Sequence, residues 1–172
     1  MIISFRDFKD EEYFIPREVF EGAGIKIFVA SDKRGVTLGV SGGEANVDLA
    51  LDEVDIDDFE AIVFVGEPGA HKYIENQECH RIAREAVEKD KILAAICIAP
   101  AILAKAGTLN GKKATVWSSA LDKNAVKILE ENGARYVRRP VVVDGKIITA
   151  DGPAAAEEFG RTIIESLTSF RR

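Results

Sequence analysis

Short apolar runs recur along the chain, separated by stretches with the spacing of amphipathic helices. Uninterrupted apolar runs of a few residues are typical of strands that are buried on both faces of a parallel sheet. These runs cover residues 25–30, 61–65, 92–96, 114–117, 141–143 and 147–149. Helical spacing extends over residues 17–23, 76–89, 120–132 and 154–169. The alternation predicts a doubly wound, flavodoxin-like α/β fold, in which helices cover both faces of a mostly parallel sheet.

One segment breaks this alternation. Residues 36–51 read "VTLGVSGGEANVDLAL", in which the turn-forming sequence Ser41-Gly42-Gly43 separates two stretches that alternate between apolar and polar residues. Tight hairpin turns need positive φ angles, which glycine adopts easily. We therefore expect an antiparallel hairpin extension of the sheet, with these three residues supplying the positive φ angles at its turn.

Length and charge narrow the class of protein. With 172 residues and 47% hydrophobic residues, the chain is long enough for one core, so we expect a single domain over residues 1–172. The net charge of −6 and the absence of a basic stripe argue against nucleic acid as a partner. No apolar run approaches the roughly 20 residues of a membrane span, and the acidic start "MIISFRDFKDEEYF" does not resemble a signal peptide. We therefore expect a cytoplasmic protein that contacts no membrane and keeps Cys79 and Cys97 reduced.

Cys97 lies where a predicted strand gives way to a predicted helix. In "KILAAICIAPAILAKAG" the apolar run suits a central strand, Pro100 suits the first turn of a helix, and Gly107 ends it. Ligands bind at the carboxyl ends of strands in open α/β sheets, and a helix start favours a thiolate and offers N–H donors to an oxyanion. Cysteine is also among the most buried residue types, so a core cysteine without chemistry is the alternative. Position alone leaves both interpretations open.

Four stretches of the sequence carry a family resemblance. "DEEYFIP", "IVFVGEPGAH", "AAICIAP" and "ILAKAGTLNGKKATVW" resemble the PfpI-type intracellular peptidase and protein deglycase superfamily, and the similarity covers nearly the whole chain. The resemblance implies the fold of class I glutamine amidotransferase domains and a reactive cysteine at Cys97. It does not assign one function, because this superfamily includes peptidases, glyoxalases, deglycases, hydratases, chaperones and redox sensors.

The resemblance also implies partners for Cys97. The family's acidic residue, four positions before a proline, corresponds to Glu12, whose protonated carboxyl would donate a hydrogen bond to the sulfur. A desolvated carboxyl has a raised pKa, which keeps it protonated. The oxyanion donors would be the backbone N–H groups of Ile98 and of Glu67, which follows Gly66 where the family has a second glycine. A Glu67 carboxylate that faced Cys97 would reduce its reactivity.

Other candidate residues are weaker. The peptidase branch has histidine directly after the cysteine, and Ile98 cannot transfer a proton, which argues against proteolysis. His71 and Trp117 are candidates for the pocket or a subunit interface, although a solvated loop histidine and a packed core aromatic are the simpler interpretations. Cys79 and His80 are adjacent on a predicted helix and point roughly 100° apart, so we expect no metal site.

Three functions therefore stay open. The first is a cofactor-free enzyme, of the glyoxalase or deglycase type, in which Cys97 attacks the carbonyl of a small molecule or of a modified protein. The second is an intracellular cysteine peptidase. The third is a redox sensor or chaperone in which Cys97 is oxidised reversibly. The resemblance further implies a homodimer or a larger homo-oligomer.

Overall fold

The structure is a computed structural model that describes residues 1–66 and 71–170. Its central sheet has the strand order β10-β11-β7-β6, where β7 is central and parallel to both neighbours, and β10 runs antiparallel to β11. All five residues of β7 are buried, as the uninterrupted apolar run predicts. The strands are β6 (Ala61–Phe64), β7 (Ile92–Ile96), β10 (Val141–Asp144) and β11 (Ile147–Ala150).

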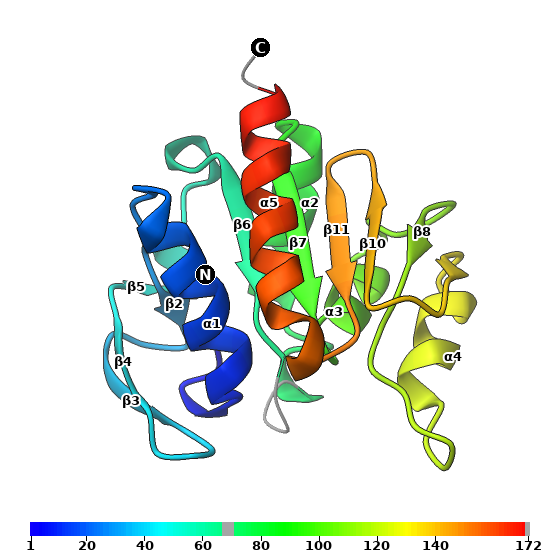
Figure 1. The fold of residues 1–172 in the computed structure, drawn as a ribbon, viewed down its shortest axis with the longest axis horizontal. Coiled ribbons are helices and arrows are strands. Elements are labelled where there is room, and N and C mark those ends of the chain that lie inside the picture. Colours follow the sequence, from blue (N-terminus) through cyan, green and yellow to red (C-terminus); the bar gives the residue numbers. More distant parts are fainter. Residues whose placement is uncertain (67–70, 171–172) are drawn as a thin grey trace.

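Helices cover both faces of this sheet (Figure 1), which confirms the predicted doubly wound architecture. Ile92, Ala94 and Ile96 pack with residues of α5 on one face, while Leu93 and Ala95 pack with residues of α2 and α3 on the other. Helix α1 packs against α5, and α4 packs against α3. The helices are α1 (Asp10–Gly22), α2 (Gln77–Glu88), α3 (Pro100–Lys105), α4 (Asn124–Glu131) and α5 (Ala156–Phe170), with 3₁₀ turns at Leu51–Glu53, Ile56–Asp58 and Pro153–Ala155.

The first residues of the chain lie beside β6, which the sequence pattern did not predict. Ile2 forms parallel bridges to both Ala30 and Phe64, and its backbone N–H donates to the Val63 carbonyl at 2.8 Å. We predicted a strand over residues 25–30, but only its last residue, Ala30, pairs with another strand. Ala30 belongs to β2 (Ala30–Ser31), which pairs with β5 (Leu49–Ala50). The N-terminal segment takes the place between residue 30 and β6.

The predicted hairpin is present, but it forms a separate sheet with β1 instead of extending the central sheet, and its turn differs from our expectation. Strand β3 (Gly35–Gly39) pairs antiparallel with β4 (Glu44–Val47) and parallel with β1 (Arg6–Phe8). Of the three predicted turn residues, only Gly42 has a positive φ, of 88°. Gly43 instead lies close to Asp10, because a Cβ there would lie 2.4 Å from an oxygen of the Asp10 carboxylate and would force that side chain to move.

Three other element boundaries differ from the prediction. Helix α1 begins at Asp10, seven residues before the predicted start at residue 17, and includes Pro16. Helix α4 begins at Asn124 instead of residue 120, because the Ser119 hydroxyl accepts the N–H of Asp122 and closes a turn first. The run 114–117 contributes only the end of β8 (Lys113–Ala114), which pairs with β9 (Arg135–Tyr136).

Among the described helices, none has both the length and the apolar character needed to cross a membrane.

Candidate active site

Cys97 follows β7 directly and has a strained backbone. Its φ of 62° lies in the left-handed region, which residues with a side chain rarely adopt. Two hydrogen bonds hold this conformation: the Cys97 N–H donates to the Ala150 carbonyl at 2.9 Å, and the Trp117 N–H donates to the Cys97 carbonyl at 2.9 Å. Such strain persists only where the surroundings fix it, and it is concentrated at functional sites. The predicted strand-to-helix turn at Cys97 is therefore present.

Glu12 reaches Cys97 from the first turn of α1. The residue is fully buried, and neither carboxyl oxygen has a hydrogen-bond partner of ordinary geometry among the residues that the structure describes. Burial raises the pKa of Glu12 to about 8, and the nearby Cys97 thiol, Lys9 and the Gly66 backbone offset only part of that rise. Glu12 is therefore mostly protonated at neutral pH.

Asp10 fixes the start of the helix that carries Glu12. Its carboxylate accepts the backbone N–H groups of Ser41 and Gly43, each at 2.8 Å. These bonds join the first turn of α1 to the turn of the β3–β4 hairpin. The hairpin thus contributes to the placement of the buried carboxyl, although it contains no residue of the site.

The Cys97 thiol has a raised pKa, contrary to the expectation from a helix start. Burial is the main cause, and the charge of an ionised Glu12 adds to it. The Ile98 N–H and Lys9 act in the opposite direction but are weaker. Helix α3 has only six residues, so its dipole is small. Protonation of Glu12 removes the opposing charge and supplies a donor for the sulfur.

A cleft of about 710 Å³ opens over this pair. It brings together five of the residues singled out from the sequence: Glu12, His71, Cys97, Ile98 and Trp117. Ile98 is only 9% exposed, whereas Trp117 is 37% exposed and forms part of the cleft wall. The sixth candidate, Gly66, lies against Cys97 and Glu12, and the seventh, Glu67, falls outside the described residues.

Three polar residues of the cleft were not predicted: Lys9, Asp122 and Asn124. Lys9 lies three positions before Glu12, a separation at which side chains share one face of a helix, so the spacing could have indicated it. Asp122 comes from the turn before α4 and Asn124 is the first residue of α4, and no local pattern relates this segment to Cys97. His80 lies elsewhere, buried in α2 with its Nε2 2.7 Å from the Ile74 carbonyl oxygen. No cluster of three or more His, Cys, Asp or Glu side chains suited to a metal ion occurs in the described ranges.

Gly66→Ala is expected to lower the free energy of unfolding by about 1–3 kcal/mol, the usual cost of overpacking. An added Cβ would lie 2.5 Å from the Ile96 carbonyl oxygen and 2.7 Å from the Cys97 Cβ, so the backbone beneath Cys97 must move. Urea unfolding measures the loss. Gly22→Ala is the matched control, because nothing lies within 4 Å of its Cβ position. Equal stability of the two variants would show that Gly66 is not sterically required.

Glu12→Gln is expected to change how stability depends on pH. Glu12 has a pKa of about 8 in the folded protein and near 4.5 when unfolded, so the folded state binds a proton more tightly. Between these values, the stability of the wild type should fall relative to the variant by up to roughly 1.4 kcal/mol per pH unit. Urea unfolding of both proteins at several pH values from 5 to 8 measures this difference. Parallel curves would show that the folded-state pKa of Glu12 is not raised.

Comparisons with known proteins place the chain in a family. A family model described as the DJ-1/PfpI family matches residues 1–166. A protein named a deglycase, from Thermococcus kodakarensis, is 34% identical over 169 residues, which cover 97% of this chain and 98% of that protein. One named a glutathione-independent glyoxalase, from Caenorhabditis elegans, is 26% identical over 161 residues, covering 94% and 83% of the two chains. The solved structure of a ThiJ/PfpI domain protein from Brachyspira murdochii has a TM-score of 0.93 and 33% identity, covering 98% of this chain and 94% of that one. These findings confirm the resemblance found in the sequence, and the chain belongs to the DJ-1/PfpI family.

Proposed function

We propose that the protein is a cofactor-free, cysteine-dependent enzyme that acts on reactive carbonyl compounds. One observation carries the proposal: a strained cysteine and a buried, protonated carboxyl line the same cleft, which is large enough for a small molecule. The names of the deglycase and glyoxalase relatives support the same class of substrate. Methylglyoxal is the simplest compound of this class.

The proposed chemistry needs only the thiol and one acid–base group. The Cys97 thiol loses its proton to solvent, and its sulfur forms a bond to the aldehyde carbon as protonated Glu12 gives its proton to the carbonyl oxygen. The Glu12 carboxylate then takes the proton on that carbon and delivers it to the neighbouring keto carbon, while the proton of the new hydroxyl passes to the keto oxygen, which leaves a thioester. Water releases the acid and the thiol, and Glu12 regains a proton from solvent. Overall, methylglyoxal and water give lactate. The aldehyde carbon is oxidised as the keto carbon is reduced, so the reaction needs no external oxidant.

The oxyanion formed in the first step needs a donor. The Ile98 N–H already acts on the Cys97 sulfur, so it lies close to the reacting atoms. The backbone of Glu67 is the second donor in this proposal. A deglycase substrate would present the same carbonyl-derived group on an amine or thiol, and the cleft volume of about 710 Å³ exceeds that of a modified side chain.

The other two functions are less well supported. A peptidase needs an acid for the leaving amine, and the residue after the cysteine is the apolar Ile98. His71 lines the cleft but is exposed, and no hydrogen bond of its ring is found among the described residues. A redox sensor would use the same Cys97–Glu12 pair, so the assay must separate it from the enzyme. Homo-oligomeric assembly and a cytoplasmic location remain predictions.

The proposal is tested by incubating the wild type with methylglyoxal in a buffer free of amines and small thiols. We expect consumption of methylglyoxal with formation of one enantiomer of lactate, since a chiral site protonates one face of the keto carbon. A panel of fluorogenic peptides, assayed in parallel, should give no hydrolysis. Hydrolysis of peptides without lactate formation would favour the peptidase. Inactivity on both substrates, with Cys97 gaining two oxygens under mild peroxide, would favour the sensor.

A further inference from the structure

A second, smaller pocket adjoins the cleft. Its volume is about 300 Å³, and the catalytic residues proposed above do not line it. Five of the residues that line it carry hydrogen-bond donors, which are three hydroxyl groups, one ammonium and one guanidinium. A sixth carries a carboxyl group. These polar residues are Ser118, Ser119, Lys123, Tyr136, Arg138 and Asp151.

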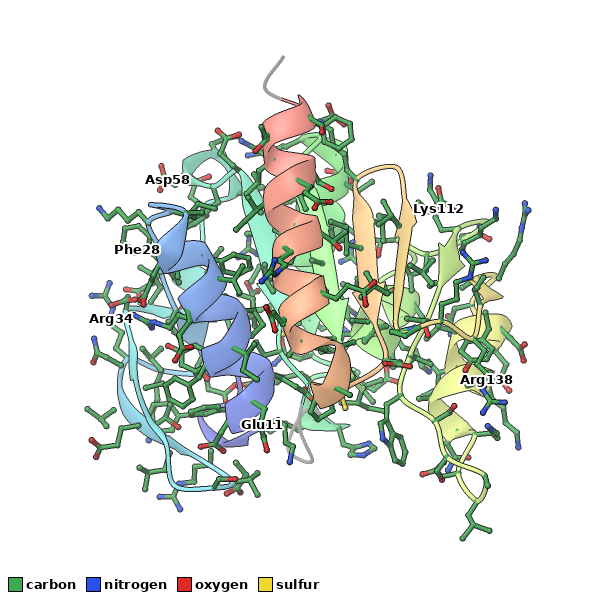
Figure 2. All side chains as sticks on the ribbon, viewed as in Figure 1. Glu11, Phe28, Arg34, Asp58, Lys112 and Arg138 are labelled. Atoms are coloured by element: carbon green, nitrogen blue, oxygen red, sulfur yellow. The ribbon has the colours of Figure 1, made fainter. Side chains whose placement is uncertain are left out.

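The pocket contains an excess of positive charge without acidic partners. Arg138 is exposed, beside α4 (Figure 2), and its guanidinium makes no ion pair or hydrogen bond with any described residue. Among the described residues, the Lys123 ammonium has no acidic partner, and it donates a hydrogen bond to the Ser118 hydroxyl at 3.5 Å. Asp151 is half-buried and pairs with neither of them. Two cations therefore face one carboxyl, and burial raises the pKa of that carboxyl.

Hydroxyl groups supply further donors. The Ser118 and Tyr136 hydroxyls lie 3.4 Å apart, so at least one of their protons is available to a ligand. The Ser119 oxygen accepts the N–H groups of Leu121 and Asp122, which leaves its own proton free to donate. A planar guanidinium, an ammonium and several hydroxyls are the groups that bind carboxylate and phosphate in proteins.

The backbone of Cys97 connects the two pockets. Its N–H donates to Ala150 and its carbonyl accepts from Trp117. The residues that follow these two partners, Asp151 and Ser118, line the second pocket, while Trp117 lines the cleft. The second pocket therefore lies directly beside the site of Cys97.

We propose that this second pocket binds an oxyanion, either a phosphate or a carboxylate group. Binding of the anion stands independently of the proposed function. We also infer that the bound phosphate or carboxylate group belongs to the carbonyl substrate itself, and this second step rests on the proposed function. The Arg138 guanidinium and the Lys123 ammonium are the main ligands, and the hydroxyls of Ser118, Ser119 and Tyr136 supply additional hydrogen bonds. Asp151 opposes the anion and limits its affinity.

The test is an NMR titration of the full chain with inorganic phosphate, and in parallel with acetate, at constant ionic strength. The Cys97→Ala protein is used, so that the result does not depend on catalysis. We expect saturable shifts of the Ser118, Ser119 and Arg138 amides. Arg138→Gln and Lys123→Gln should each weaken binding by at least about tenfold, because each removes a charge-assisted contact. Asp151→Asn should strengthen it.

Arg139→Gln is the matched control, because it removes the same charge from the next residue, which does not line the pocket. Its affinity for phosphate should stay within about twofold of the parent, as expected for an exposed charge. Equal weakening by Arg138→Gln and Arg139→Gln, or no saturable shift with either anion, overturns the proposal. Binding of one anion but not the other identifies which oxyanion the pocket accepts.

Discussion

Cys97→Ala is expected to reduce lactate formation from methylglyoxal by at least about a thousandfold, the scale of losses when a covalent nucleophile is removed. Cys97 is the only thiol that lines the cleft over the described residues, so no second sulfur can form the adduct. The measurement is the initial rate of lactate formation at saturating methylglyoxal, compared between wild type and variant. Alanine removes only the sulfur and meets the same backbone strain at this φ of 62°, so the variant should remain folded.

Cys79→Ala is the control for general loss of a thiol. Cys79 is fully buried on the inner face of α2, away from the cleft. Its replacement should lower stability by creating a small cavity but leave the rate per folded molecule unchanged. The wild type should also be alkylated at Cys97 well before Cys79. A Cys97→Ala protein that keeps more than a tenth of the wild-type rate would exclude the covalent mechanism.

The turn that exposes Cys97 could be predicted because local sequence determines it. The run that forms β7 is uniformly apolar, Pro100 begins α3 and Gly107 follows its end with a φ of 84°. Each of these signals lies within a few residues of the cysteine. The resemblance added Glu12, which the structure places beside the sulfur, although its role has still to be tested.

The electrostatics of the site could not be predicted in the same way. The sequence shows a cysteine before a helix, which favours a low pKa, but the pKa depends on how deeply tertiary packing buries the sulfur. The start of the helix that carries Glu12 is held by Asp10, which binds the hairpin turn, a contact between residues about thirty positions apart. Periodicity carries no information on such contacts.

The same limit applies to the sheet. Residues 25–30 and the N-terminal segment are both apolar, and periodicity alone cannot decide which of them pairs with β6. The structure places Ile2 there, where it bridges Ala30 and Phe64. Asp122 and Asn124 were missed for a related reason, because only the packing of α4 against α3 brings their turn to the cleft.

Glu12→Gln is the second change expected to have a large effect. Glutamine keeps the size of the side chain and can donate a hydrogen bond, but it cannot give up or take a proton. The proposed chemistry routes two proton transfers through Glu12, so we expect kcat for methylglyoxal to fall by about a hundredfold to ten-thousandfold, the range for loss of a general acid–base group. KM should change little, because glutamine keeps the size of the Glu12 side chain in the cleft lining.

Glu11→Gln is the matched control. Glu11 is the adjacent residue of α1, with a side chain that is 46% exposed and 3.5 Å from the Lys9 ammonium. An exposed ion pair of this kind contributes little, so the rate should stay within about twofold of the wild type. A similar loss in both variants would indicate that α1 is displaced and would remove the evidence for a specific role of Glu12.

The pH profile separates proton transfer from a purely structural role. Because Glu12 has a pKa of about 8 and the proposed first step needs its protonated form, wild-type kcat/KM should fall above about pH 8. Glutamine does not titrate, so the residual kcat/KM of Glu12→Gln should not fall above pH 8 in this way. If the variant loses activity but its kcat/KM still falls above pH 8, another group causes that fall. Glu12 would then be a residue that positions Cys97 by packing against it, and the proton transfers would need a different carrier.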